Sequence, residues 1–263
     1  MALTDNLLKI LDHVAYGYSG KLLTLGVQEL VLSNGYKNKL KKKLKKKEFF
    51  FELTANSILK NLGFSSIDTL EYPGMEESDI SLDLNKKLPK KYYSKYDFIF
   101  DLGFMEHVYN VPEVMKSLNL LLKPNGKIIH FNPCQGSMNH GFYNFQPTFY
   151  FSFYKTCNYK NLKIFLIEAK TNSISGGMVT EVCQNINNMN YLTNKGSSTY
   201  IVSFATKKNN SKFKIPNQEF YQNIFNAKKK TNGGLIPTRI YNKIVGRTKN
   251  NNHENLIKKS FYI

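Results

Sequence analysis

Several features are scarce or missing in this 263-residue sequence, and each absence excludes a class of protein. There are three cysteines, an odd number with no CxxC spacing, which argues against a disulfide framework and favours a reducing compartment. No apolar run approaches the ~20 residues that a membrane-spanning helix needs. The first twenty residues mix charged and apolar side chains, which is typical of an amphipathic helix and not of a signal peptide. We therefore expect a cytoplasmic protein without a membrane span.

Arginine is nearly absent, although the formal net charge is +18. Arg239 and Arg247 are the only arginines, so lysine supplies almost all the positive charge. Proteins that read DNA bases rely on bidentate arginine contacts, whereas contacts to phosphates do not require them. Lys, Asn, Ile, Phe and Tyr also share A/T-rich codons, so an A/T-rich genome would give this composition without selection for binding. The charge leaves a nucleic acid as an alternative partner but does not by itself indicate one.

Familiar catalytic motifs are missing as well. The sequence contains no GxSxG, HExxH or P-loop pattern, and the lack of GxGxxG argues against a nicotinamide-dependent dehydrogenase. Glycine is scarce where a nucleotide-binding α/β domain normally needs it. The loop in "KLLTLGVQEL" has a single glycine, Gly26, and the Cβ atoms of Val27 and Gln28 follow it. The sequence leaves open whether this is a working cofactor loop.

What is present is an alternation of strands and helices in a chain that is 41% hydrophobic, enough for a sizeable core. Apolar runs predict strands at 21–27, 64–68, 78–85, 95–103, 127–133, 162–169 and 198–207. Helical spacing and stop signals predict helices at 5–17, at 51–64 and from 111 to the "KPNG" stop. The lysine-rich segment from Asn34 fits either a short helix or a loop. "PTFYFSFY" fits a core helix.

This pattern predicts an α/β fold, a Rossmann-like, doubly wound and mostly parallel seven-stranded sheet with an antiparallel hairpin at one edge. No crossover helix separates the last two strands, which is why we expect them to be antiparallel. We expect residues 1–206 to form this domain. Residues 207–263 are rich in Lys and Asn with weak periodicity, and we interpret them as a C-terminal arm or extension.

Polar residues follow the predicted strands at their carboxyl ends, where ligands bind in open parallel sheets. The candidates in strand order are Gly26, Asp68, Asp83, the segment 103–107 and the segment 132–134. An acid after the second strand is placed to accept from ribose hydroxyls, and one after the third to accept from an adenine amino group. Either acid alone would also suit a turn.

The run "YDFIFDLGFMEHVYNVPEVMKSLNLLLKPNGKIIHFNP" resembles the second half of class I S-adenosylmethionine (SAM)-dependent methyltransferases. The resemblance covers roughly residues 20–206, and "HGFYNFQP" is similar to a stretch in a largely uncharacterised methyltransferase-like group. It implies SAM as the cofactor. It places Gly26 at the methionine end, where Gln28 or Glu29 would replace a missing acid, Asp68 on the ribose and Asp83 near the adenine. It makes Leu102 and Gly103 the floor beside the sulfonium.

Glu106, His107 and His140 are the candidate catalytic residues. A histidine beside the transferred methyl group suits a general base, although one that satisfies a backbone carbonyl is an equal alternative for His107. Some quinone O-methyltransferases bind a divalent metal through "ExxEH" at this step, but here Gly103 stands at the first position, so we expect no metal site.

Tyr143 and Asn144 lie in an aromatic insert that suits a small polar or sugar-like acceptor. His130, inside a strand, is expected to be a satisfied core histidine.

Two functions remain open from the sequence. The first is a SAM-dependent methyltransferase that acts on oxygen or nitrogen of a small-molecule acceptor. The second is a non-catalytic, methyltransferase-like binding or scaffold protein that has lost cofactor use, which the single-glycine loop favours. A nucleic-acid methyltransferase is a weaker third, because the "NPPY"-type motif of base amino-methyltransferases is absent. The sequence gives no oligomeric state.

Overall fold

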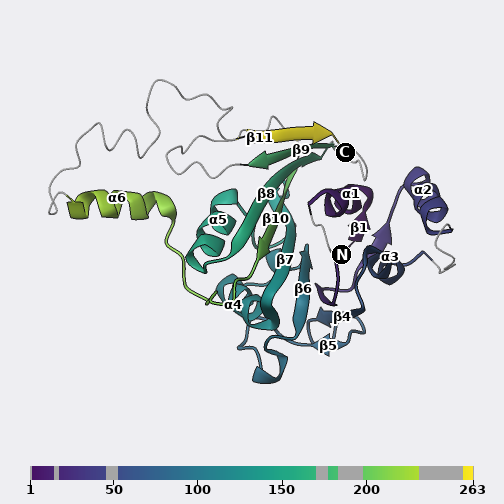
Figure 1. Ribbon diagram of the computed structural model, residues 1–263, viewed down its shortest axis with the longest axis horizontal. Helices are drawn as coiled ribbons and strands as arrows, with labels where there is room; N and C mark the ends of the chain where they lie inside the picture. The colour runs from purple at the N-terminus through teal and green to yellow at the C-terminus, as the bar shows by residue number, and fades with distance from the viewer. Residues whose placement is uncertain are drawn as a thin grey trace.

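The computed structural model describes residues 2–14, 18–45, 53–169, 177–182, 198–230 and 257–262, and its centre is a large twisted sheet (Figure 1). The strands of this sheet are, in chain order, β2 (Lys21–Leu25), β4 (Ser66–Glu71), β5 (Ile80–Ser81), β6 (Tyr96–Leu102), β7 (Leu122–Gln135), β8 (Lys160–Ala169), β9 (Gly177–Val182), β10 (Thr199–Thr206) and β11 (Ile257–Tyr262). The α-helices are α1 (Asp5–Val14), α2 (Asn34–Lys45), α3 (Ala55–Leu62), α4 (Val111–Leu121), α5 (Pro147–Thr156) and α6 (Glu219–Lys230). A separate two-stranded sheet joins β1 (Ala2–Thr4) to β3 (Glu29–Val31).

The strand order of the large sheet is β11-β9-β8-β10-β7-β6-β2-β4-β5. From β7 to β5 all neighbours are parallel, whereas β10 is antiparallel to both β7 and β8. The chain builds outward from β2 in both directions, so the order reverses between β2 and β6, which defines a topological switch point. The doubly wound, mostly parallel sheet with an antiparallel edge is thus confirmed.

The sheet has nine described strands and not the predicted seven. The two additional strands are β9, which forms an antiparallel hairpin with β8, and β11, which pairs with β9. β11 lies near the end of the chain, far in sequence from its partner, so local periodicity could not reveal it. The predicted division of the chain after residue 206 remains a prediction.

Helices cover both faces of the sheet, as a doubly wound fold requires. Alternate residues of β2 enter different cores, because successive side chains of a strand point to opposite faces. Leu23 and Leu25 pack with α4 and α5, and Leu22 packs with α1 and α3. Figure 1 shows α4 and α5 on one side of the sheet and α1 and α3 on the other.

The helix signals of the sequence act as expected. Thr54 forms a capping box with Ser57 at the start of α3, and Gly63 ends that helix at φ 124°. Asn110 caps α4, which has Pro112 in its first turn. The lysine-rich segment forms α2, which resolves the choice between helix and loop. Tyr150, Phe153 and Tyr154 of α5 are buried, which confirms the core-helix prediction for "PTFYFSFY".

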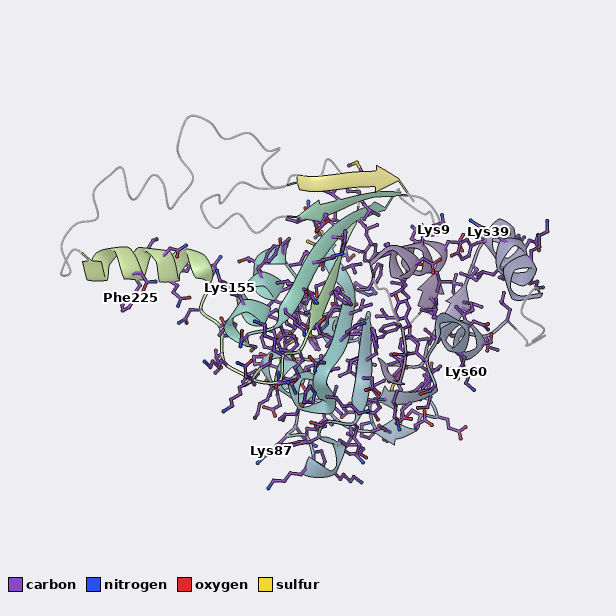
Figure 2. The ribbon with its side chains drawn as sticks, viewed as in Figure 1. Lys9, Lys39, Lys60, Lys87, Lys155 and Phe225 are labelled. Atoms are coloured by element: carbon purple, nitrogen blue, oxygen red, sulfur yellow. The ribbon has the colours of Figure 1, made fainter. Side chains whose placement is uncertain are left out.

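Lysine side chains occur on many parts of the surface. Figure 2 labels lysines on separate parts of the molecule: Lys39 on α2, Lys87 at the bottom of the view and Lys155 on α5. None of the helices in the described ranges is long and apolar enough to cross a membrane.

Candidate functional site

The loop after β2 makes a tight turn at the carboxyl edge of the sheet. Gly26 adopts φ +80°, and its N–H donates to the carbonyl of Leu70 at 2.8 Å. The side chain of Gln28 folds back and donates from Nε2 to the carbonyls of Leu25 (3.2 Å) and Gly26 (3.0 Å). Its buried Oε1 has no hydrogen-bond partner among the described residues. The chain then enters β3 before the helix α2, so the loop is longer than a direct strand-to-helix turn.

Glu71, which we did not single out from the sequence, stands at the carboxyl end of β4. In the parallel register Leu25 pairs with Leu70, so Glu71 lies level with Gly26. Its Oε1 accepts from Val27 N–H at 2.9 Å, and its Oε2 from Tyr72 N–H at 3.2 Å. The side chain is 9% exposed, and a carboxylate has about four acceptor positions, so two remain for a ligand. A carboxylate therefore sits beside the glycine turn.

Asp68 lies elsewhere, and the prediction that the strand ends there is wrong. β4 continues three residues further, and Asp68 sits within it. Its Oδ2 accepts from Tyr96 Oη at 2.7 Å and pairs with Lys21 Nζ at 2.7 Å. Tyr96 and Lys21 are the first residues of β6 and β2, so Asp68 interacts at the amino end of the sheet, away from Gly26.

Asp83 reaches the carboxyl edge through a turn and not as part of a strand. β5 ends at Ser81, and Leu82 N–H donates to the carbonyl of Glu71 at 2.9 Å, so the residue before Asp83 is bonded to the end of β4. Asp83 Oδ1 accepts from the backbone and the side chain of Asn85, both at 2.9 Å. The Asn85 side-chain hydrogen bond is the largest influence on the pKa of Asp83 and lowers it, so the carboxylate stays ionised.

Leu102 and Gly103 form the sharp turn at the end of β6. Leu102 is buried, and Gly103 has φ +91°, which an L side chain rarely adopts. Asp101 fixes this turn, because its Oδ1 accepts from the N–H groups of Phe104 (3.2 Å) and Met105 (3.0 Å). The one-turn helix η2 (Met105–His107) follows and carries the candidate catalytic pair.

Glu106 is 1% exposed, which is unusual for a carboxylic acid. Its Oε2 accepts from Asn132 Nδ2 at 2.9 Å. Burial is the largest cause that raises the pKa of Glu106, the neighbouring Asp101 carboxylate adds to the rise, and the hydrogen bond from Asn132 opposes it, so the pKa is raised to about 7. This side chain can therefore gain or lose a proton near neutral pH.

The insert after β7 folds back over this turn and brings His140 to Glu106. Phe142 N–H donates to the Glu106 carbonyl at 2.8 Å, and a Cβ on Gly141 would lie 2.8 Å from the same oxygen, so only glycine allows the approach. His140 Nε2 lies 3.7 Å from Glu106 Oε1, and the rings of His107 and His140 are 5.0 Å apart. Partial burial lowers the pKa of His107, and His140 lowers it further, so His107 is neutral at pH 7. The structure thus brings the three catalytic candidates Glu106, His107 and His140 together, while their catalytic role stays a prediction.

A buried hydrogen-bond network, which the sequence did not reveal, holds Glu106 through Asn132. His130 bonds Asp101 through Nδ1 at 2.7 Å, and its Nε2 lies within hydrogen-bond distance of Tyr154 Oη. Asn132 donates to Asp101 at 3.1 Å as well as to Glu106, and accepts from Tyr150 Oη. His130 is therefore a satisfied core histidine, as predicted. The signal that could have revealed the network is Asp101, a fully buried charged residue that follows the apolar run Phe98–Phe100 of β6.

Tyr143 and Asn144 flank this cluster in the insert. Tyr143 is half-buried and donates from Oη to the Tyr109 carbonyl at 2.8 Å, and Asn144 is exposed. Beside them, the rings of Tyr109 and Phe142 meet edge to face at 5.6 Å and are 71% and 64% exposed. Exposed aromatic surface of this kind suits contact with an apolar part of a ligand.

Comparison with known proteins gives similarities to solved structures alone. No family model matches the chain, and no curated protein matches it. A SAM-dependent methyltransferase from Archaeoglobus fulgidus is 11% identical, with 77% of this chain and 91% of that chain covered and a TM-score of 0.42. A putative methyltransferase from Bacillus halodurans is 8% identical, with 78% and 99% covered and a TM-score of 0.44. The similarity to an S-adenosylmethionine-dependent methyltransferase from Mesorhizobium loti (14% identity, TM-score 0.30) spans 48% of this chain and 53% of that chain.

Proposed function

We propose that this protein is a SAM-dependent methyltransferase that acts on oxygen or nitrogen of a small polar or sugar-like acceptor. The observation that carries the proposal is the carboxylate of Glu71, which is bound to the amide of Val27 beside the Gly26 turn at the topological switch point. An acid at this place can accept from both hydroxyls of a ribose. We therefore transfer to Glu71 the ribose role that the sequence assigned to Asp68.

Other residues near the carboxyl ends of β2 and β5 have side chains suited to the adenine and the amino-acid portion of SAM. The ionised carboxylate of Asp83 can accept from the adenine amino group. Gly26 has no side chain that would keep a ligand from the backbone, and Gln28 Oε1, which lacks a partner among the described residues, can accept from an ammonium group. Leu102 and Gly103 stand on the neighbouring β6 end, where an apolar floor is expected.

When bound, SAM supplies a methyl group on a positively charged sulfur, and an acceptor oxygen or nitrogen displaces the thioether as the new bond forms. The acceptor also loses a proton, and His107 is neutral at pH 7 and exposed, so it can take that proton. His140 and Glu106 lie within reach of the same space. The remaining contribution of the chain is to hold the acceptor against the methyl group.

A second function, a non-catalytic protein of the same fold, is favoured by the β2 loop. It has one glycine, the Val27 amide is already bonded to Glu71, and β3 separates the loop from α2. Such a protein would bind its partner through other surfaces.

Calorimetric titration with SAM and with S-adenosylhomocysteine separates the two functions. The methyltransferase proposal predicts binding of both ligands at micromolar concentration. Absence of heat from either ligand at millimolar concentration would overturn it and favour the non-catalytic function. Steeply salt-dependent binding of RNA or DNA would instead point to a nucleic-acid acceptor.

A further inference from the structure

We propose that Glu106, His107 and His140 form a binding site for a divalent transition-metal cation. Each residue offers one ligand atom, and the three atoms all lie within 4.8 Å of one another. The sequence argued against a metal site because Gly103 replaces the first ligand of an "ExxEH" pattern. The geometry supplies a third ligand from a different segment, His140 of the insert.

The ligand chemistry favours a first-row transition metal over Mg²⁺ or Ca²⁺. Two imidazoles and one carboxylate suit Zn²⁺, Co²⁺, Fe²⁺ and Mn²⁺, whereas the alkaline-earth ions prefer oxygen ligands alone. Three protein ligands with open positions are typical of catalytic metal sites, and structural zinc sites normally have four. His107 and His140 are exposed, so the open positions face solvent.

The three groups need only a small adjustment to reach bonding distance. Ligands bound tetrahedrally at ~2.1 Å lie roughly 3.4 Å apart, so atoms that lie within 4.8 Å of one another have to close by at most about 1.4 Å. Glu106 is fixed by its buried surroundings, whereas the side chain of His140 is 54% exposed and has room to turn. We therefore expect the imidazole rings, and not the Glu106 carboxylate, to move when a metal binds.

The residues around Glu106 orient its carboxylate by hydrogen bonds, as the outer-shell residues of a metal site orient a metal ligand. Asn132 donates to its Oε2, and Asn132 is held in turn by Asp101 and Tyr150, so the carboxylate orientation is set from behind. Oε1 remains on the side of His140. No lysine or arginine of the described segments forms an ion pair with this buried acid, and a divalent cation would supply the opposite charge.

The site lies at the β6 end, where the proposed reaction places the acceptor. Cation binding itself is independent of that reaction, but a role for the cation rests on the proposed function. With the cation bound, His107 would act as a ligand and not as the base. An acceptor hydroxyl at an open position would then lose its proton to solvent, because a bound divalent cation lowers the pKa of an attached oxygen acid.

Titration of the full chain with Co²⁺, followed by calorimetry and visible absorbance without SAM, tests the site. We expect one Co²⁺ per chain and loss of binding of about a hundredfold or more in His140→Gln and in His107→Gln, beyond the 10–100-fold that outer-shell changes cause. The double variant His13→Gln/His253→Gln removes two other imidazoles and should bind as the wild type does. Thermal melts of each variant check folding.

Three results would overturn the proposal. They are no binding by the wild-type chain, equal binding by His140→Gln, and an intense thiolate-to-cobalt absorption band, which would place the ion on a cysteine. The SAM titration needs no added metal, so failure of the metal site and failure of the methyltransferase proposal give separate signals.

Discussion

The carboxyl edge of the sheet has two halves that hold their polar groups in different ways. In the first half, at the ends of β2, β4 and β5, each carboxylate is held by groups close to it. Glu71 accepts from the amides of Val27 and Tyr72, and Asp83 accepts from the backbone and side chain of Asn85 and pairs with Lys86. In the second half, at the ends of β6 and β7, the side chains of Asp101, Asn132 and Glu106 bond one another, and all three are buried.

The difference indicates which half depends on a ligand and which is set by the fold. Carboxylates bound to a few backbone amides keep free acceptor positions, so the first half is ready to bind polar groups of a ligand. The second half satisfies most of its polar groups internally, which fixes Glu106 through Oε2 and leaves Glu106 Oε1 and the two exposed histidines to meet a ligand. The following substitutions test this difference between the two halves, in order from the largest expected effect on stability to the smallest.

Asp101→Ala should produce the largest loss of stability. Asp101 is fully buried and joins Phe104 N–H, Met105 N–H, His130 and Asn132, so its removal leaves several buried groups without partners. We expect the free energy of unfolding to fall by about 3–5 kcal/mol, as measured by urea denaturation. Glu113→Gln, which breaks a partly exposed pair with Lys116, is the control and should change it by less than about 1 kcal/mol. Equal effects would show that the buried network contributes no more than a surface pair.

Tyr150→Phe should have an intermediate effect. It removes the hydroxyl that donates to Asn132 Oδ1 inside the core, and an unsatisfied buried acceptor costs about 1–3 kcal/mol. Tyr143→Phe removes a hydroxyl from an exposed hydrogen bond to Tyr109, and water can replace that partner, so its effect should be under about 1 kcal/mol. Denaturation midpoints at constant m-value give the comparison. A larger loss in Tyr143→Phe would contradict the assignment of the rigid network to α5.

Gly26→Ala and Gly35→Ala should change stability in opposite directions. Gly26 has φ +80°, where an L residue costs about 1–3 kcal/mol, so the β2 loop should be destabilised. Gly35 lies in α2 with open space around its Cα, so alanine should raise stability by about 0.4–1 kcal/mol. Melting temperatures of the two variants check the signs, and a stabilised Gly26→Ala would mean that the loop turns differently.

The sequence predicted the framework well, because its local signals agree with the fold. Gly63 ends α3 as its stop signal predicted, although the helix begins at Ala55 and not at 51, and the parallel order followed from the alternation of strands and helices. The sequence also named Glu106, His107 and His140 as candidates one by one, and "GFMEHV" and the "HGFY" insert follow the neighbouring strands β6 and β7, but that the three side chains meet is a finding of the structure.

The errors have physical reasons. We ended the second strand at its first acid, although the "YPG" turn that follows Glu71 marks the end of β4. The contacts of Tyr150 and Tyr154 with β7 depend on how α5 packs on the sheet, which no local pattern encodes. The pairing of β9 with β11 joins segments far apart in the sequence, for the same reason.

The most direct test of the account is calorimetric SAM binding by Glu71→Gln and Asp68→Asn beside the wild type. The glutamine still accepts from Val27 N–H but loses the charge, and since hydrogen bonds to charged groups contribute about 1.5–3 kcal/mol, we expect roughly 10–100-fold weaker binding. Asp68→Asn changes a residue bonded at the other end of the sheet, so its dissociation constant should match that of the wild type. Weakened binding in Asp68→Asn with unchanged binding in Glu71→Gln would contradict the assignment of the ribose site to the end of β4.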